Sequence, residues 1–354
     1  MKPINTMDIP FRKIIRNVAI FGAVVLVGAE FLFRQRYVEP AREAAPLIEE
    51  IQQYLILDDQ IGFNWKPKIS ASENITFPDQ DQIVYPLSTD SDGFINSPEA
   101  IANIEAGHRP HIVGVGDSFL EHGAHVLTEY FGEQGLIYRN LAMHRQSPAQ
   151  FTDIVETYAV PLKPDLIVYS IYENDFQETG DYKNWEETDP DWFTFHSGTW
   201  CGTPLATTDG GRLADAWVPG YRALYRLISL RFTSRSDGKN GIPLGIVPRM
   251  TVEIVRASEF ASEAHIDFVV LLIPSRDSAV DSLTREAHEY SRILFVLSVS
   301  DIPYIDLREI YGKHSDPSTL YYRNNGHWNE SGIMIAADEI FELLSAFAEI
   351  GSPK

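Results

Sequence analysis

From residue 111 to the end of the chain, short apolar runs alternate with longer segments of helical periodicity. The runs expected to form strands are residues 111–115, 136–141, 165–171, 267–273 and 303–305. The segments expected to form helices lie within 123–135, 148–160, 248–263, 282–299 and 330–348. Strands that alternate with helices of ten or more residues predict βαβ units and a mostly parallel sheet. We therefore expect an α/β domain.

The composition supports a large folded domain and excludes some functional classes. Of the 354 residues, 44% are hydrophobic, which is enough for a sizeable core. The formal net charge of −21 would repel phosphate backbones, so we expect no nucleic-acid partner. The single cysteine, Cys201, cannot form an intramolecular disulfide. Packing alone must therefore hold the fold together.

One segment near the N-terminus is apolar enough to span a membrane. From Ile14 to Phe33 the chain has 20 residues, which as a helix would be about 30 Å long, the hydrocarbon thickness of a bilayer. Lys2, Arg12 and Lys13 precede it, and positive charge there favours a cytoplasmic N-terminus. We expect residues 1–36 to be a cytoplasmic N-terminus and a single-pass transmembrane signal anchor, with the main domain in the periplasm or exterior.

Two other interpretations of this segment stay open. Residues 27–29, Val-Gly-Ala, resemble the small-residue site at which a signal peptide is cleaved. The segment could also be a buried core helix of the soluble domain. The retained anchor is favoured because residues 31–33, Phe-Leu-Phe, extend the apolar stretch beyond the cleavage position.

An N-terminal extension and a long insertion fall outside the alternation. Residues 37–84 begin with Pro40, Pro46 and helical periodicity as far as Leu55, so we expect a stalk with a short helix, followed by strands and turns. Residues 176–246 separate the third strand from the next helix and contain four of the six tryptophans. The insertion is interpreted either as a satellite core under a long loop or as a lid that faces the substrate.

Four short motifs lie after the strands or at a helix start. They are Gly116-Asp117-Ser118-Phe119, the stretch from Asn140 to Pro148, Asn174-Asp175-Phe176 and Gly326-His327-Trp328-Asn329. Ligands of open α/β sheets bind at the carboxyl ends of the strands, so one edge can hold all four motifs. A serine at a strand-to-helix turn is exposed there as a nucleophile, although Asp-Ser at a helix start is also a common N-cap.

This arrangement predicts a nucleophilic mechanism. Ser118 would attack an ester carbonyl, and His327 would take its proton as general base. The backbone N–H groups of Ser118 and Arg145 and the side-chain amide of Asn174 would donate to the developing oxyanion.

Other polar residues near these motifs have plainer interpretations. His122, His125 and His144 lack a carboxylate or cysteine that would complete a recognised metal spacing, so no metal site is expected. We interpret Asp175 as a structural hydrogen-bonding residue rather than a general base. Trp328 is interpreted as packing behind the histidine rather than binding a sugar.

The four motifs, in this order, resemble the blocks of the SGNH (GDSL-type) hydrolases, in their membrane-anchored bacterial branch. The resemblance covers about residues 85–350 and includes Ser91-Asp92-Gly93-Phe94 ahead of the first block. It implies a three-layer α/β/α flavodoxin-like sandwich, a covalent acyl-enzyme on Ser118, and no metal or cofactor.

Two positions depart from the family pattern. The second-block glycine of the family corresponds to Arg145, which keeps the backbone N–H but adds bulk and positive charge. The family's acid, which orients the histidine, corresponds to Asn324 or Asn325. An amide can set the imidazole tautomer but cannot stabilise an imidazolium as a carboxylate does. Asp306 and Asp316, in nearby loops, are candidates to replace it.

The sequence therefore predicts a membrane-anchored serine hydrolase acting on ester bonds, as an acylesterase or acyltransferase. The expected partners are an ester-bearing carbohydrate or lipid substrate, the membrane and a membrane protein complex. The alternative is a catalytically degenerate domain that serves as a structural or binding subunit of a membrane assembly, which Arg145, Asn324 and Asn325 favour.

Overall fold

The computed structural model describes residues 20–22, 28, 54–58, 60–70, 74–76, 84–173, 175, 176, 178, 179, 246–280, 285–322 and 326–351. The chain divides into two compact units, Met1–Ile48 with Ser197–Gly241 and Glu49–His196 with Ile242–Lys354. In the first unit the described residues are 20–22 and 28, which are helical. Every element discussed below belongs to the second unit.

Most of the predicted anchor and insertion lie outside the described residues. This applies to residues 1–19, 23–27 and 29–36 of the anchor, and to residues 177 and 180–245 of the insertion. Within the part of the chain that the structure describes, no helix has both the length and the apolar composition needed to cross a membrane. The anchor and the two interpretations of the insertion therefore stay predictions.

Five parallel strands form the central sheet. They are β5 (Ile112–Val115), β6 (Tyr138–Asn140), β7 (Leu166–Ile171), β8 (Asp267–Leu272) and β9 (Tyr304–Asp306). Their order is β6-β5-β7-β8-β9, and every neighbouring pair is parallel. In chain order this is the 2-1-3-4-5 arrangement of flavodoxin-like folds. The predicted parallel sheet is confirmed, with every strand boundary within two residues of its expected place.

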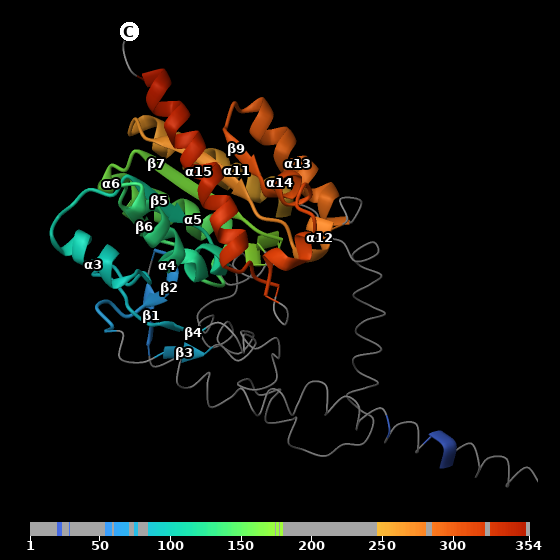
Figure 1. The fold of residues 1–354 in the computed structure, drawn as a ribbon. Helices are drawn as coiled ribbons and strands as arrows, with labels where there is room; N and C mark the ends of the chain where they lie inside the picture. The colour runs from blue at the N-terminus through green and yellow to red at the C-terminus, as the bar shows by residue number, and fades with distance from the viewer. Residues whose placement is uncertain are drawn as a thin grey trace, which may run out of the picture. The chain divides into compact units, whose positions relative to one another are not determined.

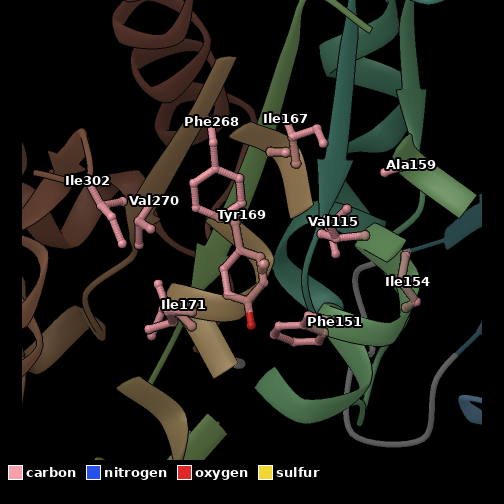
Figure 2. Close-up of a cluster of buried hydrophobic side chains, with 14 of the residues drawn as sticks. Val115, Phe151, Ile154, Ala159, Ile167, Tyr169, Ile171, Phe268, Val270 and Ile302 are labelled. Carbon is pink, nitrogen blue, oxygen red and sulfur yellow. The ribbon is translucent and has the colours of Figure 1, made fainter. Parts of the chain in front are cut away.

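One helix layer covers the first face of the sheet. It contains α5 (Pro148–Ile154), α11 (Ile246–Glu263) and α13 (Arg285–Val299). Their apolar side chains pack on Ile167, Tyr169 and Ile171 of β7. Figure 2 shows Tyr169 in this cluster, with Val115 and Phe151 on one side and Val270 on the other. The Tyr169 hydroxyl donates to the Pro148 carbonyl at 2.8 Å, so its polar end is satisfied inside the core.

A second layer covers the opposite face. It contains α4 (Ser118–Glu133), α14 (Leu307–Tyr311) and α15 (Glu330–Gly351). These helices pack on Leu166 and Val168 of β7, because successive side chains of a strand point to opposite faces. Both faces are thus buried, as in other all-parallel sheets, and the expected three layers are confirmed (Figure 1).

Shorter elements complete the described domain. The segment expected as one helix over 148–160 continues from α5 through a π-helical turn, Val155–Ala159, into α6 (Val160–Leu162). Sequence patterns did not predict four short helices: α3 (Pro98–Glu105), α12 (Arg276–Val280), α14 and the 3₁₀ helix Pro317–Leu320. These elements are eight residues or shorter, too short for helical periodicity to identify.

The segment expected to be a stalk contains a hairpin packed into the domain. Strand β1 (Leu55–Asp58) pairs antiparallel with β2 (Gly62–Trp65), and a second hairpin joins β3 (Asn74–Thr76) to β4 (Val84–Pro86). The expectation of helix as far as Leu55 is wrong, because Leu55 lies opposite Trp65 in the hairpin. Ile61 and Trp65 are fully buried, so this segment is part of the core. Residues 37–53 lie outside the described residues.

The turn ahead of the first motif is tied to β6 by a buried ion pair. Arg139 donates from Nη2 to Asp90 Oδ2 at 2.8 Å and to Asp92 Oδ2 at 2.6 Å. Gly93 in this turn has φ 89°, and a Cβ there would lie 2.4 Å from the Trp65 carbonyl oxygen. The Ser91-Asp92-Gly93-Phe94 motif therefore joins the β1–β2 hairpin to the edge of the sheet.

This turn generates a prediction with a matched control. Gly107 also has a positive φ, 74°, but nothing lies within 4 Å of a Cβ placed there. Gly107→Ala should cost about 1–2 kcal/mol of unfolding free energy, from the left-handed backbone alone. Gly93→Ala should cost about 1–3 kcal/mol more, because the methyl group meets the Trp65 carbonyl. Denaturant unfolding of both variants measures the difference, and equal losses would contradict the close approach.

Candidate active site

Ser118 lies in the first turn of α4, directly after strand β5. Asp117 is the N-cap residue, and its side chain accepts a hydrogen bond from the Phe119 backbone N–H at 3.0 Å. Backbone N–H groups in a first turn have no partner within the helix. They also lie at the positive end of the helix dipole. The local structure therefore places the Ser118 hydroxyl where negative charge is stabilised, and its N-cap is Asp117 rather than Ser118 itself.

His327 reaches Ser118 from the far end of the chain. Its Nε2 lies 2.8 Å from Ser118 Oγ, a hydrogen-bond distance. The backbone of His327 is held in place, because Tyr322 N–H donates to the His327 carbonyl at 2.9 Å. Trp328 is fully buried and donates from its indole to the Phe119 carbonyl at 2.8 Å. The packing role expected for Trp328 is therefore confirmed, and it acts by fastening the histidine loop to the start of α4.

The imidazole ring of His327 packs between two other rings. The Phe119 ring centroid lies 4.7 Å away and the His122 ring centroid 4.4 Å away. Phe119 in turn contacts Tyr172 at 4.0 Å between centroids. His122 is one helical turn after Ser118, so both residues lie on the same face of α4. These contacts restrict the orientation of the base.

The loop that follows β6 lies beside the nucleophile. Leu141 N–H donates to the Gly114 carbonyl at 2.7 Å and Met143 N–H to the Gly116 carbonyl at 3.0 Å, which extends the β5–β6 pairing beyond the strands. Gln146 N–H then closes a turn onto the Met143 carbonyl at 3.3 Å. Arg145 in this turn has φ 65°, in the left-handed region where glycine is favoured. The backbone at Arg145 therefore has a conformation that suits glycine, the residue that the SGNH resemblance implies at this position, and Arg145 adopts it at some cost.

Glu121 holds this loop against α4. Its carboxylate is fully buried and accepts three hydrogen bonds: from Trp65 Nε1 at 2.7 Å, from His144 N–H at 2.8 Å and from His144 Nδ1 at 2.6 Å. The carboxylate thus joins β2, α4 and the residue before Arg145. Sequence analysis missed Glu121, although its position three residues after Ser118 puts both on one helix face.

The base has a strongly reduced affinity for protons. Burial, the charge of Arg145 and the nearby His144 lower the pKa of His327 from its usual 6.5 to about 3. Burial, with His327 and His144, also lowers the pKa of His122 well below its usual value. A neutral imidazole can accept the proton of Ser118, so His327 is in the working protonation state at neutral pH.

Three buried carboxyl groups lie behind the nucleophile. Oxygen atoms of Asp117, Asp175 and Glu178 lie within 4.8 Å of one another. Burial and the two neighbouring carboxylates raise the pKa of Asp175 well above its usual value. Asp175 Oδ2 also accepts a hydrogen bond from Tyr172 N–H at 2.7 Å. The hydrogen bond agrees with the structural interpretation of Asp175, while burial and the two neighbouring carboxylates favour its protonated form.

Several predicted site residues do not appear among these contacts. Asn174, Asn324 and Asn325 lie outside the described residues, so their predicted roles stay predictions. The Asp306 carboxylate caps α14 and pairs with Arg308 at 2.7 Å, while Asp316 caps the Pro317–Leu320 helix. Both carboxylates thus have structural roles of their own.

The predicted histidines do not form a metal-binding group. Within the described part of the chain, the one cluster of three or more His, Cys, Asp or Glu side chains close enough to hold an ion is the carboxyl trio of Asp117, Asp175 and Glu178. His122, His125 and His144 are not part of it.

Comparisons with known proteins identify a fold likeness at low identity. A GDSL-like lipase from Bacteroides thetaiotaomicron is 14% identical over 70% of this chain and 97% of its own, with a TM-score of 0.42. An acetylxylan esterase from Geobacillus stearothermophilus is 10% identical over 66% of this chain and 94% of its own, with a TM-score of 0.40. A lipase/acylhydrolase from Enterococcus faecalis is 10% identical over 67% and 96%, with a TM-score of 0.38.

Sequence comparisons give no assignment. No family model matches the chain, and no curated protein matches it. The structural likenesses are too distant to assign an activity or a substrate. The function must therefore be argued from the geometry of the site.

The carboxyl trio generates a prediction about pH. A group whose pKa is raised on folding contributes stability below its ordinary pKa, 3.8 for Asp175, and loses it as the pH rises through the folded value. The unfolding free energy of the wild type should therefore fall relative to that of Asp175→Asn as the pH increases above about 4. Denaturant unfolding at several pH values measures this difference. Asp277→Asn, at an exposed position, is the control, and a difference independent of pH for Asp175→Asn would contradict the raised pKa of Asp175.

Proposed function

We propose that this chain is a serine hydrolase that cleaves or transfers the acyl group of an ester. The observation that carries the proposal is the 2.8 Å contact between Ser118 Oγ and His327 Nε2. A nucleophile within hydrogen-bond reach of a base is the geometry that covalent acyl transfer requires. A further support is that Ser118 begins the helix that follows β5, at the carboxyl edge of the parallel sheet, where open α/β folds bind their ligands.

The reaction proceeds in two halves through an acyl-enzyme. The Ser118 hydroxyl loses its proton to His327 Nε2, and Oγ forms a bond with the ester carbonyl carbon. The tetrahedral intermediate then collapses, the ester C–O bond breaks, and the alcohol leaves with the proton from His327. Water attacks the acyl-Ser118 ester in hydrolysis, and an acceptor hydroxyl attacks it in transfer. His327 takes the proton of the attacking group, which Ser118 Oγ recovers on leaving.

The oxyanion of the tetrahedral intermediate needs donors that are already in place. The Ser118 backbone N–H is one, at the positive end of the α4 dipole. The Arg145 backbone N–H and the Asn174 side-chain amide are the other two that we propose, from the sequence motifs. The hydrogen bonds that the His144 backbone N–H and Nδ1 donate to the Glu121 carboxylate fix the turn that carries Arg145. Donors held this rigidly need no reorganisation as charge develops.

We also propose where the enzyme acts and on what. The apolar segment 14–33 would anchor it in a membrane, with the catalytic domain in the periplasm or exterior, because basic residues precede the segment. The substrate would be an acylated carbohydrate or lipid. The tryptophans of the 176–246 insertion support a carbohydrate, since aromatic rings offer flat apolar faces to a sugar.

The nucleophile can be tested with a fluorophosphonate probe on the full chain in detergent. The wild type should be labelled, and Ser118→Ala should lose both labelling and ester hydrolysis, by several orders of magnitude in rate. Ser275→Ala is the matched control, because Ser275 follows β8 at the same sheet edge and bonds to Ser278 Oγ at 3.2 Å. Wild-type turnover by a folded Ser118→Ala variant would refute the assignment. A folded wild type that is neither labelled nor active would instead support a structural or binding subunit.

The low pKa of His327 predicts the pH dependence of the enzyme. His327 must be neutral to accept a proton, so kcat/KM should fall as the pH decreases through the histidine's pKa of about 3. A base with the ordinary pKa of 6.5 would be about 90% protonated at pH 5.5. We therefore expect kcat/KM on a neutral ester to change little between pH 7 and pH 5.5. A tenfold loss of kcat/KM over that range would contradict the lowered pKa of His327.

A further inference from the structure

The backbone conformation of Arg145 carries a free-energy cost that a glycine would avoid. Its φ of 65° is unfavourable by about 1–2 kcal/mol for a residue with a Cβ. Its guanidinium also stands close enough to His327 to lower the pKa of the base. The first effect costs folding free energy, the second disfavours the imidazolium that would form as Ser118 attacks, and neither would arise with glycine.

The Arg145 side chain is partly open to solvent. It is 29% exposed, whereas Glu178, its acidic neighbour, is 3% exposed and lies 4.0 Å from Nη1. The guanidinium therefore lies near a buried carboxylate while the side chain as a whole stays partly open to solvent. Its charge acts on His327, whose Nε2 lies 2.8 Å from Ser118 Oγ, so Arg145 is close to the proposed catalytic pair. A planar guanidinium with five N–H donors matches carboxylate and phosphate groups, which it can bind through two parallel hydrogen bonds.

We infer that Arg145 binds an anionic group of the substrate, a carboxylate or a phosphate, close to the ester bond that Ser118 attacks. The inference rests on the proposed function, and it defines the substrate class more closely. Arg145 is then a specificity-determining residue whose backbone serves the oxyanion and whose side chain selects the substrate.

Binding of such a group would also change the base. In the part of the chain that the structure describes, the titratable and charged side chains around His327 are His122 from α4, and His144 and Arg145 from the loop after β6. Of these, Arg145 carries a permanent positive charge, which disfavours the imidazolium formed as Ser118 attacks. An anion paired with the guanidinium cancels that charge and raises the proton affinity of His327 in the complex. The substrate's charge should therefore increase kcat as well as lower KM.

Two acetate esters with the same ring test the inference on the full-length enzyme. They are 3-acetoxybenzoate, which carries a carboxylate, and its neutral methyl ester; 3-acetoxyphenyl phosphate is a third arm that separates carboxylate from phosphate recognition. In each, the acetyl group passes to Ser118 Oγ and the phenol leaves with the proton from His327. We expect kcat/KM for one of the two anionic esters to exceed that for the methyl ester by at least about tenfold, the effect of one charge-assisted hydrogen bond.

Arg145→Gly is the decisive variant. It removes the guanidinium, keeps the backbone N–H and avoids the free-energy cost of a left-handed backbone conformation. The preference for the anionic ester should fall to about one. Arg145→Lys keeps the charge without the planar fork, so an intermediate preference is expected. Arg109→Ala is the control for the change of net charge, since Arg109 is 51% exposed, pairs with Asp165 and precedes β5 at the opposite end of the sheet.

The pH profiles of kcat and kcat/KM distinguish substrate binding by Arg145 from a purely structural role, which would not separate the two profiles. The acid limb of kcat/KM reports the free enzyme and that of kcat the substrate complex. For the anionic ester in the wild type, the acid limb of kcat should lie at least about one pH unit above that of kcat/KM. In Arg145→Gly the two limbs should coincide. Equal profiles in the wild type would overturn the coupling between Arg145 and the base.

The outcomes separate this inference from the proposed function. Hydrolysis of all three esters with no preference by charge, unchanged in Arg145→Gly, would overturn the inference and leave the serine hydrolase intact. Absence of both turnover and probe labelling would overturn the proposed function and the inference with it. If Arg145→Gly does not fold, binding of the product 3-hydroxybenzoate to Ser118→Ala and to Ser118→Ala/Arg145→Lys decides, because equal affinities would contradict recognition by the guanidinium.

Discussion

One buried carboxylate, that of Glu121, connects the parts of the site. It accepts hydrogen bonds from the Trp65 indole N–H, from the His144 backbone N–H and from His144 Nδ1, all between 2.6 and 2.8 Å. Because α4 carries Glu121 three residues after Ser118, the same helix positions the nucleophile and the loop proposed to hold the oxyanion. Loss of this carboxylate would leave buried donors unsatisfied, at about 1–3 kcal/mol each. The N-terminal hairpin is thereby a structural requirement of the site rather than a spacer.

The site also concentrates opposing charges in a small buried volume. Asp117, Asp175 and Glu178 lie on one side of the nucleophile, with the Arg145 guanidinium 4.0 Å from Glu178. A proton favoured on Asp175 reduces the negative charge of the trio, and Arg145 offsets part of the rest. Arg145 therefore interacts with a buried anion behind it and with the catalytic base beside it. An anion that binds to the exposed part of Arg145 would therefore change how strongly the guanidinium acts on Glu178 and on His327.

The sheet and its helices were predictable from the sequence because their signal is local and periodic. Apolar runs such as 165–171 are buried on both faces, which makes them continuous, and the four motifs follow from where these strands end. The hairpin around Leu55 and Trp65 was not predictable, since a short apolar spacing fits a strand as well as a helix. Glu121 was missed for a different reason: the partners of a buried carboxylate come from distant parts of the chain, and no spacing indicates them.

The two departures from the SGNH pattern that the sequence resembles would act on the same quantity, the proton affinity of His327. Arg145 lowers it by adding positive charge, and an amide at position 324 or 325 would not raise it as the family's carboxylate does. Both changes make the imidazolium costlier as the serine attacks. An anionic substrate paired with Arg145 would supply negative charge that the chain itself does not provide at those positions. In our proposal the two departures are thus linked, because negative charge on the substrate would offset the effect of both on the imidazolium of His327.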